Sequence, residues 1–169
     1  MISDTMETEG YEQVLGRLQA LCSRRECCSS DILRKATASL DGDSALAGKL
    51  LSSLQEDGFV DDRRYAAAFA REKSRLSGWG PAKITTALVM KGIPRDTARQ
   101  ALLQIDEAEA FRKMVSVLEA KYASLRGDPH EKFKLLRFAL SRGYDYEAVA
   151  PVVERLVSGL EAGVKDDDE

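Results

Sequence analysis

The stretch "PAKITTALVMKGIPRDTARQALLQI", Pro81 to Ile105, decides the fold class of this chain. Proline is favourable at the first position of a helix, and apolar residues then recur at helical spacing. Gly92 supplies the left-handed cap that commonly ends a helix, and Pro94 can open a second helix after it. The stretch therefore predicts two short helices joined by a glycine turn. One face of each is formed by Ile84, Ala87, Leu88 and Lys91, and by Ala98, Ala101, Leu102 and Ile105.

The same pattern recurs 51 residues later and 51 residues earlier in the chain. In the later copy both the apolar positions and the glycine cap match. In the earlier copy Leu40-Asp41-Gly42-Asp43 replaces the Gly92 turn, so we expect that loop to be built differently. Three copies at one spacing predict an internal repeat. Matching positions are Ile84 with Leu135 and Leu33, Ala98 with Val149 and Ala47, and Leu102 with Val153 and Leu51.

A longer helix fits before each pair, from Tyr11 to about Glu26, Asp62 to about Leu76 and Asp106 to about Leu125. We therefore predict an all-α fold: an elongated, curved array of three tandem three-helix repeats, each of roughly fifty residues. Pro151 should kink the last helix or delay its start. The predicted boundaries are a disordered acidic N-terminus 1–10, repeats 11–60, 61–105 and 106–160, and a disordered acidic tail 161–169.

The formal net charge of −3 belongs largely to the two ends of the chain. Between Tyr11 and Leu160 there are 24 basic and 20 acidic residues, a net charge of +4. Residues 61–105 are more strongly basic, with nine lysines and arginines against four acids. This distribution predicts a basic surface on the second repeat.

A stripe of basic residues follows one side of the helix predicted from Asp62. Arg64, Arg71 and Arg75 recur at i, i+7 and i+11, with Lys73 beside them and Lys83 entering from the next helix. The buried side of that helix is predicted to be Tyr65, Ala68, Phe69 and Leu76. Such a stripe would suit a polyanion or an acidic protein surface, although a merely solvated face has the same pattern.

Two aspartates and one tryptophan flank this stripe. Asp61 and Asp62 stand where a helix begins, so we interpret them as capping residues rather than a catalytic pair. Trp79 is the single tryptophan and lies between two glycines and before Pro81. It could anchor a protein interface, but the flanking turn residues favour a plug in the elbow between two helices.

Signals of enzymatic, metal or membrane chemistry are weak. The sequence holds no phosphate-binding loop, no dinucleotide-binding glycine motif and no nucleophile elbow, and its one histidine, His130, fits a cap or surface position. Cys22, Cys27 and Cys28 lack the spacing of a zinc set, so we expect no metal, no cofactor and free thiols. Without an apolar membrane span or a secretory signal at the N-terminus, we expect a cytoplasmic protein.

The segment "GFVDDRRYAAAFAREKSRLSGWGPAKITTALVMKGIPRDTARQAL", Gly58 to Leu102, resembles the central region of the bacterial regulatory protein RecX family. The resemblance weakens but stays collinear across Tyr11 to Leu160. It is carried by Gly58-Phe59-Val60-Asp61-Asp62, Tyr65, Phe69, Arg71, Gly78-Trp79-Gly80-Pro81 and Lys91-Gly92-Ile93.

This resemblance implies tandem three-helix repeats that bind the RecA recombinase. It implies a non-enzymatic, monomeric inhibitor that binds the RecA filament on single-stranded DNA and suppresses ATP hydrolysis and strand exchange in DNA repair. Weak binding to single- or double-stranded DNA stays open, as does the alternative of a helical DNA-binding protein that acts independently of RecA. The candidate partner-binding residues are Arg64, Arg71, Lys73, Arg75, Lys83 and Lys91, and the structural motif comprises Asp61, Asp62, Trp79, Gly80, Pro81 and Gly92.

Overall fold

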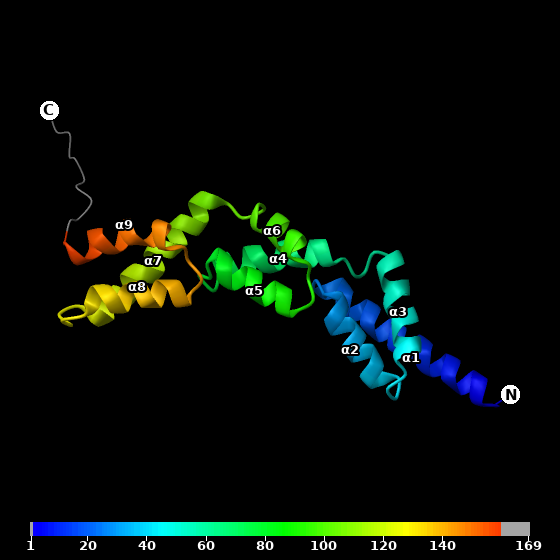
Figure 1. Cartoon of the computed structure of the whole chain (residues 1–169). Helices are drawn as coiled ribbons and strands as arrows, with labels where there is room; N and C mark the ends of the chain where they lie inside the picture. Colours follow the sequence, from blue (N-terminus) through cyan, green and yellow to red (C-terminus); the bar gives the residue numbers. More distant parts are fainter. Residues whose placement is uncertain (1, 160–169) are drawn as a thin grey trace. The chain divides into compact units, whose positions relative to one another are not determined.

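A computed structural model of the chain describes residues 2–159, with side chains described from residue 10 onward. Within this range the fold is all-α, as predicted, since helices joined by turns and loops are formed and no strand is. Figure 1 shows a longer helix before each pair of short helices, in the order that the sequence predicts. They are α1 (Ile2–Arg24), α2 (Ser29–Ser39), α3 (Ser44–Glu56), α4 (Asp62–Arg75), α5 (Pro81–Met90), α6 (Arg95–Leu102), α7 (Glu107–Leu125), α8 (Glu131–Ser141) and α9 (Tyr146–Val157).

The chain divides into two compact units, and the division does not follow the predicted repeat boundaries. The first unit comprises Met1–Phe69 and Leu88–Ala101, and the second comprises Ala70–Ala87 and Leu102–Glu169. The second repeat is thus shared between both units. Its helices have only 14, 10 and 8 residues. A module this small buries too little apolar surface to stand as a unit of its own. Several of its buried residues are alanines: Ala66, Ala70, Ala98 and Ala101.

Helices α1, α2 and α3 pack together in the first unit (blue to cyan in Figure 1). Their buried cluster consists of Val14, Leu18, Cys27, Ile32, Ala36, Ala47, Leu50, Leu54 and Val60. Helix α1 begins at Ile2, so it covers residues that we expected to be disordered. Acidic residues near a helix N-terminus are favourable to the helix dipole, and an acidic composition therefore does not exclude a helix there. The predicted tail 161–169 lies outside the described residues.

The first repeat departs from the 51-residue spacing within α2. Ile32 is completely buried there, whereas Leu33, which the spacing placed in the core, is 38% exposed. The buried pair Ile32 and Ala36 lies 52 residues before the buried pair Ile84 and Leu88. The stretch from Ile32 through the loop before α3 to the buried Ala47 is one residue longer than that from Ile84 to the buried Ala98, so Ala47 again lies 51 residues before Ala98. The loop is built differently, as expected, because Asp41 and Gly42 both adopt positive φ angles, 52° and 87°.

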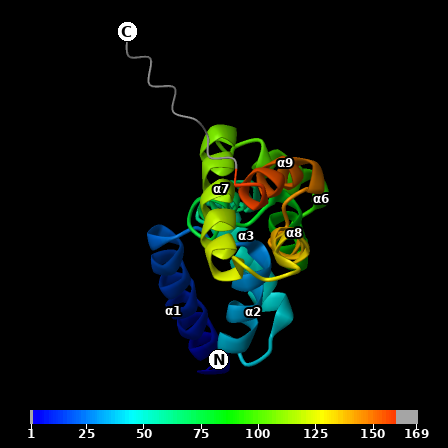
Figure 2. The same cartoon turned by 90° about the vertical axis from the view of Figure 1, so that its left-hand side faces the viewer.

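Helices α7, α8 and α9 pack together in the second unit, and Figure 2 shows α7 running beside the other two. Asp106 caps α7 by accepting a hydrogen bond from the Glu109 N–H at 2.8 Å. Helix α9 continues through Pro151, so the proline does not delay its start. The buried cluster consists of Met114, Leu118, Leu135, Ala139, Tyr144, Val149, Val152 and Val153.

The predicted buried side of α4 is wrong at its far end. Leu76 is 62% exposed and lies just beyond the helix. Ala66, Ala70 and Ser74 are buried instead, at i, i+4 and i+8. The alanine-rich run gives a similar apolar pattern in more than one register, so periodicity alone does not choose between them. The smallest side chains occupy the most crowded side of the helix.

Candidate partner-binding surface

The Gly78-Trp79-Gly80 segment turns the chain between α4 and α5. Gly78 adopts a φ of 61°, the left-handed region that glycine enters without strain. The backbone N–H of Trp79 donates to the Lys73 carbonyl at 3.0 Å and so satisfies an acceptor at the end of α4. A Cβ atom on Gly80 would lie less than 3.0 Å from the backbone of Gly143, so only glycine fits there. The predicted turn chemistry of this segment is confirmed.

The cap that ends α8 holds this turn in place. The Gly80 N–H donates to the Arg142 carbonyl at 2.8 Å. The Arg142 guanidinium donates in return to the carbonyls of Ser77 and Gly78. The Tyr144 hydroxyl donates to the Gly78 carbonyl at 2.7 Å, and burial raises the pKa of that phenol. Because these bonds join backbone to backbone and to planar side chains, the turn has little freedom to move.

The Trp79 indole brings two lysines together at this turn. The ammonium groups of Lys73 and Lys83 lie 5.4 Å and 4.7 Å from the centre of its ring. At these distances each lysine is attracted by the negative face of the ring. Lys73 also lies 3.4 Å from the Glu72 carboxylate. The half-buried indole therefore does more than fill an elbow, because it fixes the positions of two of the predicted cations.

Arg71 and Arg75 extend this basic region along α4. Both are exposed and lie one helical turn apart. Neither forms an ion pair with any carboxylate in the described part of the chain. Exposed guanidinium groups that form no ion pair within the chain are suited to paired hydrogen bonds with the carboxylates or phosphates of a partner. We call the four residues Arg71, Lys73, Arg75 and Lys83 the basic surface.

Lys91 does not belong to the basic surface, because it is used within the first unit. Its ammonium group lies 2.8 Å from the Asp31 carboxylate, and its carbonyl accepts a hydrogen bond from the Ser30 hydroxyl at 2.6 Å. The hydrogen bond with Lys91 holds the pKa of Asp31 below its usual range, and the same contact raises the pKa of Lys91. Lys91 therefore joins the cap of α5 to the start of α2.

Arg64 is likewise held by contacts within the first unit. Its Nε atom donates to both carboxylate oxygens of Glu26, at 2.7 Å and 2.9 Å. A terminal nitrogen donates to the Gly58 carbonyl at 3.0 Å. The hydrogen bond with Glu26 raises the pKa of Arg64, and the guanidinium is engaged by groups of the same unit. Of the six predicted cations, four remain as candidates for partner binding.

Lys91 and Arg142 show a signal that sequence reasoning could have used. They are 51 residues apart, each directly before a glycine cap. Each also reaches into the preceding repeat: Lys91 bonds to Asp31, and Arg142 bonds to the carbonyl of Gly78. Equivalent positions thus make equivalent joints between successive repeats. A basic residue that recurs before both caps is typical of a structural contact.

The two aspartates cap helices, as predicted. The Asp61 carboxylate accepts from the N–H groups of Arg63 and Arg64 at 2.9 Å and 3.1 Å. The Asp62 carboxylate instead accepts from the Ser29 N–H at 2.8 Å, so it caps α2 rather than its own helix. Both carboxylates thus bond to backbone donors at helix N-termini.

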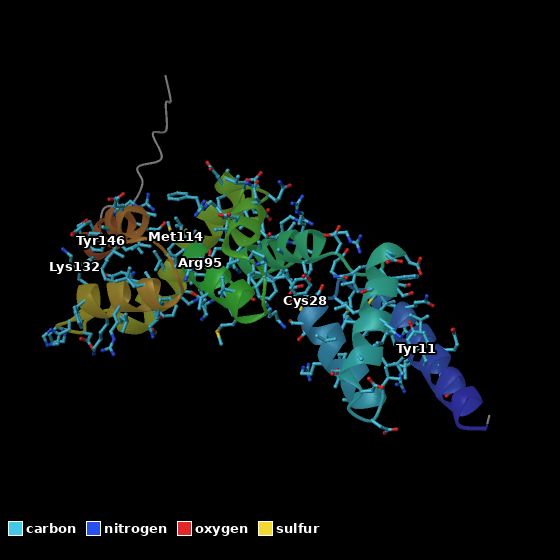
Figure 3. All side chains as sticks on the ribbon, turned by 45° about the vertical axis from the view of Figure 1, so that its right-hand side comes forward. Tyr11, Cys28, Arg95, Met114, Lys132 and Tyr146 are labelled. Atoms are coloured by element: carbon cyan, nitrogen blue, oxygen red, sulfur yellow. The ribbon has the colours of Figure 1, made fainter. Side chains whose placement is uncertain are left out.

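The cysteines lie where α1 ends and α2 begins. Cys28 is completely buried directly before α2 (Figure 3), and Cys27 beside it is buried as well. Burial and a hydrogen bond with Cys27 raise the pKa of Cys22 to about 12, so its thiol is protonated at neutral pH.

Among the described residues no group of three or more histidine, cysteine, aspartate or glutamate side chains could hold a metal ion. No helix within residues 2–159 has the length and apolar character needed to cross a bilayer.

Comparison with known proteins places these features in a family. The model of the second three-helix domain of RecX matches residues 61–102, which contain the whole basic surface. A regulatory protein RecX of Chromohalobacter salexigens is 35% identical over 133 residues, covering 76% of this chain and 83% of that protein. The chain belongs to the RecX family.

Other RecX proteins match different lengths of the chain. A regulatory protein RecX of Clostridium botulinum is 31% identical over 114 residues, which cover 65% of this chain and about half, 53%, of that relative. One from Escherichia coli O7:K1 is 27% identical over 168 residues, covering 90% of this chain and 96% of that relative. The crystal structure of RecX from Lactobacillus salivarius shares the fold, with a TM-score of 0.70, 20% identity and coverage of 94% and 99%. Another RecX crystal structure gives a TM-score of 0.78 at 19% identity, covering 90% of this chain and 76% of that chain.

Proposed function

We propose that this RecX-family chain is a non-enzymatic negative modulator of the RecA recombinase. It acts as a monomer in the cytoplasm, binds the RecA filament on single-stranded DNA, and suppresses ATP hydrolysis and strand exchange during DNA repair. The observation that carries the proposal is the similarity, over 76% of the chain, to a protein named regulatory protein RecX. The position of the basic surface within the matched residues 61–102 supports it.

The basic surface supplies the chemistry for binding such a filament. Arg71 and Arg75 are exposed on α4, and the Trp79 ring positions two lysines close to them along the chain. Cations held by a ring and by a rigid turn lose less side-chain freedom on binding than cations on a mobile loop. They can pair with carboxylates of a protein or with phosphates of the bound strand. Binding through these contacts requires no catalytic residue.

The DNA-stimulated ATPase activity of RecA tests the proposed function. Purified chain is titrated into RecA that has been assembled on single-stranded DNA, and phosphate release is followed. We expect the rate to fall in a saturable manner as the chain is added. An unchanged rate at severalfold excess of the chain over RecA would disprove the proposal.

Charge reversal tests the role of the basic surface. We expect Arg71→Glu combined with Arg75→Glu to weaken inhibition by about tenfold or more, because like charges then face the acidic groups of the partner. Both side chains are exposed, so stability should change by no more than about 0.5 kcal/mol per site. The matched control combines Arg95→Glu with Arg137→Glu, which reverses two exposed charges outside α4. Equal loss in both double variants would mean that only net charge matters.

The exposed arginines also favour a second candidate, a DNA-binding protein that acts independently of RecA. Phosphate contacts release counterions, so binding to naked single-stranded DNA would then weaken steeply with salt. Stoichiometric binding to naked DNA that RecA does not strengthen would favour this second function. Binding that requires the assembled filament would favour the first.

A further inference from the structure

An apolar pocket lies beside the tryptophan turn, entirely within the second unit. Its volume is about 430 Å³, which falls within the range of about 300–1,000 Å³ typical of binding sites. Trp79 and Ile84 form part of its wall, and Tyr144 contributes from the cap of α8. Met114 of α7, which is labelled in Figure 3, also lines it and is buried. The pocket therefore has a mainly apolar lining, to which helices and the tryptophan turn both contribute.

Phe111 gives this pocket an exposed aromatic edge. It lies on α7 three residues before Met114, lines the pocket, and is 51% exposed. Large aromatic side chains beside an apolar pocket are the usual anchors of protein interfaces. A pocket of about 430 Å³ has room for more than one side chain of a partner. The lining thus favours a protein segment over a single ion.

Two carboxylates lie at the same pocket without a positive partner. Glu107 and Asp145 both line it, and neither forms an ion pair in the described part of the chain. Asp145 is the N-terminal cap residue of α9, yet its side chain makes no capping hydrogen bond. The corresponding residue of α7, Asp106, does make one. The Asp145 carboxylate is therefore available to a cation at the pocket.

The charge at this pocket differs from that of the basic surface. The lining residues include no lysine or arginine, while Lys73 and Lys83 lie over the Trp79 ring. A nucleic acid in the pocket would bring phosphates toward two carboxylates, which is unfavourable. A protein segment with apolar side chains and a neighbouring lysine or arginine satisfies both the lining and the carboxylates.

We propose that this pocket is a docking site for a segment of RecA that presents apolar side chains next to a lysine or arginine. The inference rests on the proposed function, because it takes RecA as the partner. The apolar side chains fill the space beside Phe111 and Met114, and the cation pairs with Glu107 and Asp145. The chain would then contact its partner through two surfaces of opposite character, one cationic and one apolar with an acidic edge.

Binding to RecA filaments on single-stranded DNA tests this site with matched variants. Phe111→Glu and Asp145→Lys should each weaken binding by about tenfold or more, as expected for central interface residues. The controls are Phe133→Glu, whose phenylalanine is 65% exposed on α8 outside the pocket, and Glu119→Lys on α7. Both controls should bind within about twofold of the unaltered chain.

Hydroxyl-radical footprinting of the unaltered chain gives a readout that does not depend on a variant folding. Filament binding should protect Phe111 and Trp79 from oxidation and leave Phe133 reactive. Normal filament binding without that protection, and without loss in the pocket variants, would overturn the docking site while leaving the proposed function intact. No filament binding by the unaltered chain would overturn both. Protection of Phe111 that appears without RecA, as the chain is concentrated, would identify a second copy as the occupant and overturn the inference.

Discussion

Replacing Gly80 with alanine should destabilise the second unit strongly. The new Cβ atom would lie less than 3.0 Å from backbone atoms of Gly143 and Tyr144. Backbone atoms cannot rotate away as a side chain can, so the turn and the α8 cap must separate. The Gly80 N–H would then lose its 2.8 Å hydrogen bond to the Arg142 carbonyl.

The magnitude follows from two contributions. Overpacking a tight site costs about 1–3 kcal/mol. Loss of one backbone hydrogen bond adds about 1 kcal/mol. We therefore expect Gly80→Ala to lower the free energy of unfolding by about 2–4 kcal/mol.

Urea unfolding followed by tryptophan fluorescence measures this change, because Trp79 is the only tryptophan and lies in the second unit. Far-UV circular dichroism reports on the helices of the whole chain in the same samples. The matched control is Gly48→Ala in α3, where nothing lies within 4 Å of the added Cβ. That change should raise stability by about 0.5–1 kcal/mol, because alanine is the better helix former.

The two alanine substitutions should therefore have opposite signs. A loss below about 0.5 kcal/mol for Gly80→Ala would show that the turn and the α8 cap do not pack as described. It would also remove the physical basis for treating the Trp79 region as a rigid part of the binding surface.

Three further predictions concern the first unit. Asp31→Asn should cost about 0.5–1 kcal/mol at pH 7, because the pair with Lys91 is about one-third exposed. Since the folded pKa of Asp31 is lowered, this contribution is present above its ordinary value of 3.8 and is lost as the pH falls through the folded value. The difference in unfolding free energy between variant and unaltered chain should therefore shrink as the pH falls below 3.8, and a difference that stays constant would contradict the ion pair. Asp61→Ala should cost about 0.5–2 kcal/mol in the same assay, and no change would exclude capping. The raised pKa of Cys22 predicts slow reaction with a thiol reagent at pH 8 in the native chain and fast reaction of all three cysteines in denaturant. Fast native reaction of Cys22 would contradict its raised pKa.

The helix pattern could be predicted because it depends on local chemistry. Pro81 begins α5, Gly92 adopts a φ of 80° after it, and Asp106 caps α7. Each of these residues acts on backbone groups within a few positions of itself. The all-α fold and the repeated caps follow from such signals without knowledge of the packing.

The pairing of the basic residues could not be predicted in the same way. Arg64 meets Glu26, which is 38 positions away, and Lys91 meets Asp31, which is 60 positions away. Only the packing of successive repeats brings these groups together, and many other acidic residues could have met them. Charge spacing along the sequence therefore does not show which cations already bond to groups of the same chain.

The pocket was missed for a related reason. Phe111 lies on α7 and Asp145 lies directly before α9, and only the packing of the α8 cap against the tryptophan turn brings them to one site. Periodicity placed the turn correctly but said nothing of the space beside it. The flanking turn residues favour a plug, whereas in the structure the indole also lies beside two lysines and lines a cavity.

The most direct test of this account is the equilibrium binding of the chain to preformed RecA filaments on single-stranded DNA, compared with the same DNA without RecA. The account predicts saturable binding to the filament that is much tighter than binding to naked DNA, and about tenfold or more weakening when Arg71 and Arg75 are reversed in charge. Binding no tighter than that to naked DNA, or unchanged in the charge-reversed variant, would contradict it.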